Sequence, residues 1–272
     1  MHNYYQIPAR DLGQGAKINL RLMPDSEAVF RYLATEMLAV IREAEAAGRE
    51  VGLILPVGPV GQYAHFVRLV QEQRQSLRHV WFFNMDEYLQ DPETWIDSEH
   101  RLSFRAFMDR ALYSQLPSEL LMPESQRLFP DPRCPERLGD CLERLGGAEL
   151  CVGGIGINGH LAFNEAEPEA TVEDFSGRRT RVLEIAPETR TANAIGDLGG
   201  ALEEMPRWAV TIGMREILAS RRILLGVFRP WHRAVLRRAA YGACTAAFPV
   251  SLLQGHPNAC ICVNDVAAEL PY

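Results

Sequence analysis

The chain has 272 residues and a formal net charge of −7 at pH 7, from 28 Lys and Arg against 35 Asp and Glu. No block rich in Lys or Arg stands out, which argues against nucleic acid and anionic membranes as partners. No apolar stretch reaches the ~18 residues that cross a bilayer, and residues 1–10 lack the apolar region of a secretory signal. We therefore expect a cytoplasmic protein.

The six cysteines give no sign of a metal site, because none forms a CxxC pair and no histidine completes a zinc pattern. Cys151, Cys260 and Cys262 lie in apolar runs and are interpreted as small core residues. We expect neither a bound metal nor a cofactor.

In chain order, an irregular lead-in over 1–17 is followed by apolar runs that alternate with segments of helical spacing. Asp25 and Ser26 are good cap residues for a first helix, whose apolar positions recur up to Ala44. Further helices are predicted near 63–70, 103–113, 135–145 and 232–241. Strands or apolar runs are predicted at 20–23, 51–55, 80–83, 148–152, 208–212, 223–228, 248–253 and 259–263.

This alternation of continuous apolar strands with helices is typical of a parallel sheet that is covered on both faces. The predicted fold is a single-domain α/β protein over 1–272, doubly wound, with a mostly parallel sheet and helices on both faces. Residues 166–190 are polar and without a clear period, and we interpret them as an excursion of the kind that often acts as a lid.

Four glycines within seven residues follow the predicted strand 148–152 and precede three polar side chains, Asn158, His160 and Glu165. The alternative interpretation is a tight turn with a solvated histidine. Such a turn needs one or two glycines and no imidazole, so the amide, imidazole and carboxylate together favour acid–base catalysis.

Two further segments directly follow predicted strands: the loop around Gly58 and the segment that contains Asp86. In parallel α/β sheets, ligands bind outside the carboxyl ends of the strands. We therefore expect Gly58, Asp86 and residues 154–165 to meet in one crevice.

Residues 83–88 (FNMDEY) and 154–165 (GIGINGHLAFNE) resemble the glucosamine-6-phosphate deaminase/isomerase family, which shares its fold with the 6-phosphogluconolactonases. Weaker matches follow in the family's order at 189–193, 209–213 and 253–257. The lactonases carry a similar histidine loop but lack the Asn-Glu pair at its end.

The resemblance implies an acid–base mechanism without a cofactor, in which an amino sugar phosphate is opened, isomerised and released as fructose 6-phosphate and ammonia. By position, Asp86 resembles the base at C2 and His160 the ring-opening group, while Glu165 orients and tunes His160. Asn158 stands where many members have Asp, and it can hydrogen-bond but carries no charge. The alternative for Asp86, and equally for Glu87, is to cap the next helix.

The resemblance also implies substrate contacts at Gly58, Gly154, Gly156, Arg190 and His232. Arg190 matches the family's phosphate arginine and is expected to be the main anion contact. The family's phosphate lysine is absent after the predicted strand 223–228; His232 is nearest to its position, and Arg229, His232 or Arg233 could assist Arg190. The loop over 56–61 is shorter than in the family, has no hydroxyl, and loses an N–H donor at Pro59. These departures leave the substrate's phosphate in question.

Three functions are therefore considered. The first is an aldose–ketose isomerase/deaminase that acts on an amino sugar phosphate such as glucosamine 6-phosphate. The alternatives are a lactonase-like hydrolase of the same fold and a non-catalytic regulator that binds a sugar phosphate. The expected partner is a small-molecule sugar phosphate, and the sequence leaves a homo-oligomer open.

Overall fold

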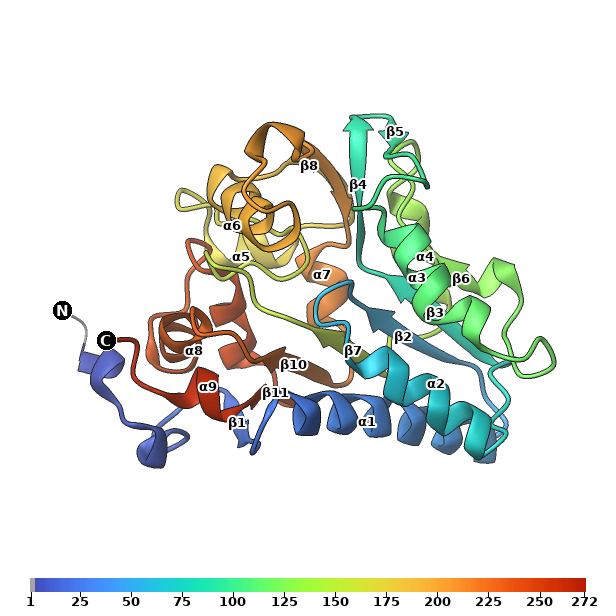
Figure 1. Ribbon diagram of the computed structural model, residues 1–272, viewed down its shortest axis with the longest axis horizontal. Helices are drawn as coiled ribbons and strands as arrows, with labels where there is room; N and C mark the ends of the chain where they lie inside the picture. The colour runs from blue at the N-terminus through green and yellow to red at the C-terminus, as the bar shows by residue number, and fades with distance from the viewer. Residues whose placement is uncertain (1–2) are drawn as a thin grey trace.

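The computed structural model describes residues 3–272, and its framework is a seven-stranded sheet in the order β1-β11-β10-β7-β2-β3-β6 (Figure 1). Every neighbouring pair in this sheet is parallel. The strands are β1 Asn19–Leu22, β2 Val51–Leu55, β3 Val80–Asn84, β6 Arg127–Leu128, β7 Leu150–Gly153, β10 Ile223–Val227 and β11 Ala259–Val263. The predicted fold class is confirmed.

Helices cover both faces of this sheet. They are α1 Ser26–Ala46, α2 Gln62–Glu72, α3 Phe104–Ala111, α4 Glu136–Arg144, α5 Val172–Ser176, α6 Pro187–Asp197, α7 Met214–Leu218, α8 His232–Tyr241 and α9 Asp265–Ala268. Side chains of β2 alternate between two cores: Leu53 packs with α1, α2 and α3, whereas Ile54 packs with α4, α7 and α8. This alternation explains why both strand faces are apolar in the sequence.

A second, four-stranded antiparallel sheet has the order β5-β4-β9-β8 and lies above the first in Figure 1. Its strands are β4 Asp86–Asp91, β5 Thr94–Trp95, β8 Arg181–Glu184 and β9 Trp208–Thr211. Only Met85 separates the end of β3 from the start of β4, so the chain passes directly from the large sheet into the small one.

The structure corrects several local expectations. The strand predicted at 208–212 forms, but as β9 of the small sheet. The excursion at 166–190 contains α5, β8 and the start of α6, and the apolar run at 248–253 is part of a 3₁₀ helix, Pro249–Gly255. The lead-in contains 3₁₀ turns at Asn3–Gln6 and Ala9–Asp11.

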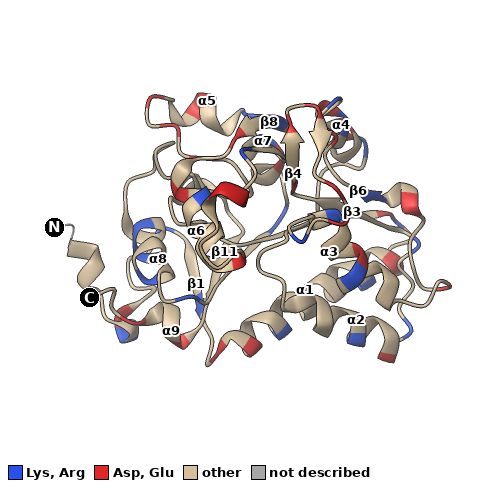
Figure 2. Ribbon diagram, turned by 45° about the horizontal axis from the view of Figure 1, so that its top comes forward, with Lys and Arg blue, Asp and Glu red and all other residues tan. Residues whose placement is uncertain are grey.

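The first predicted helix begins as expected, because the Asp25 side chain accepts the backbone N–H of Ala28 at 2.7 Å. Within residues 3–272, no helix is both long enough and apolar enough to cross a membrane. Figure 2 shows Lys and Arg interspersed with Asp and Glu over the outer elements.

Candidate active site

A cavity of about 600 Å³ opens at the carboxyl ends of β2, β3, β7 and β10. Its walls are the loop 56–61, Asp86, residues 154–156, the loop after β10, the start of α3 and the last turns of α6. The order in which strands are added to the sheet reverses at β7: β3 is added on one side of β2, whereas β7, β10 and β11 are added on the other side. This is where ligands bind in open α/β sheets.

Asp86 lies in this cavity as the first residue of β4, with 7% of its surface exposed. No described residue donates a hydrogen bond to its carboxyl group. Burial, with a smaller contribution from the charge of Glu87, raises the pKa of Asp86 to about 8. A partnerless carboxyl group with such a pKa can exchange a proton with a ligand near neutral pH.

Glu87 points away from the cavity and caps α3. Its carboxylate accepts the backbone N–H groups of Phe104 and Arg105, each at 2.9 Å, and the Arg105 side chain at 3.1 Å. Because successive strand residues face opposite sides, the capping alternative applies to Glu87 and leaves Asp86 free.

His160, Asn158 and Glu165 form one chain of hydrogen bonds. Glu165 Oε2 can only accept, so it receives Asn158 Nδ2 at 2.7 Å and thereby fixes the Asn158 amide. Asn158 Oδ1 then faces His160 Nδ1 at 2.8 Å and must accept its proton. In the neutral ring the lone pair is therefore on the other nitrogen, Nε2, and the side chain lines the cavity.

Thr189, in the first turn of α6, completes this network. Its hydroxyl donates to Glu165 Oε2 at 3.0 Å and lies 3.1 Å from His160 Nδ1. Burial alone raises the pKa of Glu165, but the hydrogen bond and charge of His160, with the donors Asn158 and Thr189, hold this pKa below its ordinary value. Thr189 lies in the matched segment 189–193, but the sequence assigns it no role, because a buried threonine has no sequence signature of its own.

Thr189→Val should lower kcat about tenfold with little change in KM, because a hydrogen bond to a buried carboxylate is lost while the cavity keeps its shape. Thr189→Ser keeps the hydroxyl and is the matched control. Steady-state kinetics of the two variants test this expectation, and equal losses in both would assign Thr189 a packing role.

The predicted glycines serve close packing between loops. A side-chain carbon at Gly154 would lie 2.8 Å from the Gly58 carbonyl oxygen, and one at Gly156 would lie 2.0 Å from the His160 ring. Gly58 itself has φ of +145°, which side chains rarely allow. All three glycines line the cavity, and the sequence placed them together correctly.

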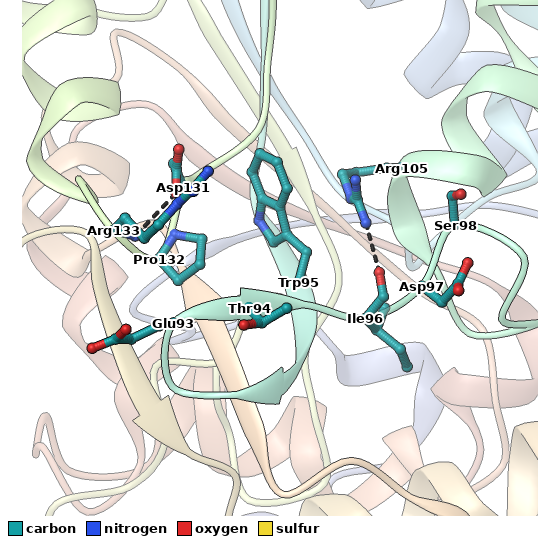
Figure 3. Close-up of a pocket in the computed structure, with 10 residues that line it drawn as sticks. All are labelled: Glu93, Thr94, Trp95, Ile96, Asp97, Ser98, Arg105, Asp131, Pro132 and Arg133. Carbon is teal, nitrogen blue, oxygen red and sulfur yellow. Dashed lines mark hydrogen bonds and ion pairs between the residues drawn. The ribbon is translucent and has the colours of Figure 1, made fainter.

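A smaller cavity of about 300 Å³ lies between β5 and residues 131–133 (Figure 3). Arg105 covers the Trp95 ring at 4.5 Å and donates to the Ile96 carbonyl. Since Arg105 also binds Glu87, this region braces α3. It contains none of the predicted site residues.

The chain was compared with known proteins and family models, and no family model matches it. Curated glucosamine-6-phosphate deaminases do match. That of Hahella chejuensis is 31% identical over 247 residues, covering 89% of this chain and 88% of the relative. That of Shouchella clausii is 30% identical over 249 residues, covering 89% and 94%. The chain belongs to the glucosamine-6-phosphate deaminase family.

Solved structures agree with this family. A monomeric glucosamine-6-phosphate deaminase, described as a missing link of the NagB superfamily, superposes with a TM-score of 0.79 at 25% identity, covering 92% of this chain and 99% of the other. The 6-phosphogluconolactonase of Trypanosoma brucei gives a TM-score of 0.67 at 16% identity, covering 93% and 98%, and so shares the fold.

Two predicted substrate contacts do not fit the geometry of this family member. Arg190 does not line the cavity, and its guanidinium donates to the carbonyl oxygens of Met205 at 3.0 Å and Leu202 at 3.4 Å. The match by position located the residue but could not give its direction, which these carbonyls determine.

His232 lines the cavity but cannot act as the expected cation. Its Nδ1 accepts the backbone N–H groups of Phe228 and Arg229, and its Nε2 lies 3.1 Å from the Ile155 carbonyl oxygen, to which it donates. Burial lowers the pKa of His232 to about 4, so the ring is neutral at pH 7. It connects the loop after β10 to the loop after β7.

Proposed function

We propose that this protein is an isomerase/deaminase that converts glucosamine 6-phosphate, or a close amino sugar phosphate, to fructose 6-phosphate and ammonia. The observation that carries the proposal is the pair of proton-transfer groups in one cavity: Asp86, buried without a partner, and His160, whose Nδ1 is bonded to Asn158 so that Nε2 is left for a ligand. The family relatives carry the same activity in their names.

His160 Nε2 takes the proton of the C1 hydroxyl and returns a proton to the ring oxygen, which opens the sugar to its aldehyde. The Asp86 carboxylate then removes the C2 proton while O1 takes a proton from the substrate's C2 ammonium group, which gives an enolamine. A proton returned at C1 gives the C2 imine, and water converts this imine to the ketone with release of ammonia. The sum is substrate plus water to fructose 6-phosphate plus ammonia.

Asn158 performs its part as a neutral amide. The negative charge is on Glu165, which is the next residue after Asn158 in the hydrogen-bond chain from His160, and the Glu165 carboxylate polarises the Asn158 amide through the 2.7 Å bond. This arrangement supports turnover by His160 without a carboxylate at position 158, and it argues against the non-catalytic alternative.

The test is to incubate the protein separately with glucosamine 6-phosphate and 6-phosphogluconolactone and to measure ammonia, fructose 6-phosphate and lactone hydrolysis. Ammonia and fructose 6-phosphate in equal amounts support the proposal. Lactone hydrolysis alone supports the hydrolase alternative, and binding without either reaction supports the regulator.

As part of the same proposal, residues 1–272 act as one functional unit in the cytoplasm. The six cysteines are all unpaired, which fits a reducing compartment. Whether copies of the chain associate is left to a measurement of molecular mass in solution.

A further inference from the structure

Two arginines line the cavity, Arg101 before α3 and Arg229 after β10, and both are exposed. Neither forms a hydrogen bond or an ion pair with another side chain among residues 3–272. Unpaired cations in the cavity of a protein with net charge −7 point to an anionic ligand.

The other cations near the loop after β10 are already engaged. Arg233 pairs with Glu269 and donates to the Val266 carbonyl oxygen at 3.0 Å. Arg190 is directed to backbone carbonyls and His232 is neutral, as described above. Only Arg229 in this region combines a place in the cavity with a free guanidinium.

Arg229 reaches across the cavity toward α6. A side-chain carbon added at Gly196 would lie 3.5 Å from Arg229 Nη1, so the guanidinium lies against the last turn of this helix.

The neighbouring wall offers few other donors to an anion. Phe30 contacts Phe228 edge to face at 5.0 Å, and the loop 56–61 contributes only Pro, Val and Gly. The backbone N–H groups of Phe228 and Arg229 both donate to His232 Nδ1. At this wall the Arg229 guanidinium is therefore the positively charged donor to a ligand anion, and its planar fork matches two oxygens of a phosphate.

We propose that Arg229 is the main contact of the anionic substituent of the substrate, a role expected of Arg190, with Arg229, His232 or Arg233 only assisting. The proposal rests on the proposed function, since it takes the substrate to be an amino sugar with a phosphate group. It assigns the contact to the loop after β10 and the last turn of α6.

Binding is the test, so that it does not depend on turnover. In the Asp86→Asn background, the dissociation constants of glucosamine 6-phosphate and of glucosamine are measured by calorimetry. Their ratio, which is the gain from the phosphate, should fall tenfold or more on Arg229→Ala. Arg110→Ala, which removes an exposed and unpaired arginine of α3 outside the cavity, is the control with the same net charge and should keep the ratio.

Parallel substitutions Arg101→Ala and Arg190→Ala compare the alternatives. The proposal is overturned if the ratio survives Arg229→Ala, or if it falls only with one of these two. A ratio near one in the unsubstituted background would also overturn it, because the cavity would then not recognise phosphate. If the ratio depends on Arg229 while the protein releases no ammonia, the anion site stands and the proposed reaction fails.

Discussion

Replacing Asp86 with asparagine should abolish proton exchange at C2 of the substrate while the fold is kept. The loss of a general base typically costs about 10²- to 10⁴-fold in rate. The measurement is solvent deuterium incorporation at C2, followed by NMR. Exchange at the unsubstituted rate would remove Asp86 from the mechanism. Glu87→Gln is the neighbouring control, because Glu87 contacts α3 and not the cavity.

The same variant should be more stable than the unsubstituted protein at high pH. The pKa of Asp86 is about 8 in the folded state and near 3.8 ordinarily, so between these values the folded chain holds a proton that the unfolded chain has lost. Stability supplied by this group is therefore lost as pH rises from about 4 to about 8. Asparagine cannot titrate and removes this loss.

Thermal unfolding from pH 5 to pH 9 measures this effect. The melting temperature of Asp86→Asn should rise relative to that of the unsubstituted protein as pH rises, by about 2 °C for each kcal/mol recovered. Asp91→Asn, at the exposed end of β4, is the matched control and should show no such trend. A pH-independent difference would mean that Asp86 is ionised throughout this range. The two results together would show a catalytic group that is kept at a cost in stability.

Six of the seven strands of the large sheet could be predicted from the sequence, because each is marked by its own apolar run; the two-residue strand β6 has no such run and was not predicted. β2, for example, is a run of five buried residues, and α1 is capped by Asp25 and carries its apolar stripe at helical spacing. The small sheet could not be predicted in the same way. Its pairing joins Asp86 and Arg181 to Thr211, residues far apart along the chain, and β8 is only half-buried, without alternation.

The residues of the site also differ in whether a local sequence pattern predicts them. Asn158, His160 and Glu165 are close in sequence, so the loop that carries them could be interpreted as one unit, and the structure joins them by hydrogen bonds. Arg190 and His232, in contrast, were expected to bind the anion only because their positions match those of phosphate-binding residues in the family. Position alone does not say that Met205 offers a carbonyl to Arg190, or that two N–H groups occupy the His232 ring. Arg229 could be named as an alternative from sequence, but its lack of a partner is a property of the fold.

Replacing His160 with glutamine should impair ring opening far more than chemistry at C2. Glutamine keeps a hydrogen bond to the Asn158 amide within reach, but it cannot carry a proton from the C1 hydroxyl to the ring oxygen. We expect a loss of about 10²- to 10⁴-fold on glucosamine 6-phosphate, as for other general acid–base groups.

The decisive comparison uses an analogue that lacks the C5 hydroxyl and therefore cannot close the six-membered ring. With this analogue His160→Gln should recover most of its C2 proton exchange, whereas Asp86→Asn should stay inactive, because Asp86 acts after the ring has opened. Equal losses of His160→Gln on both substrates would mean that His160 acts at C2 as well. That outcome would require its Nε2 and the Asp86 carboxyl group, which line the same cavity, to share one proton transfer. Opposite patterns in the two variants would instead separate the mechanism into a ring-opening step at the loop after β7 and an isomerisation step at the end of β3.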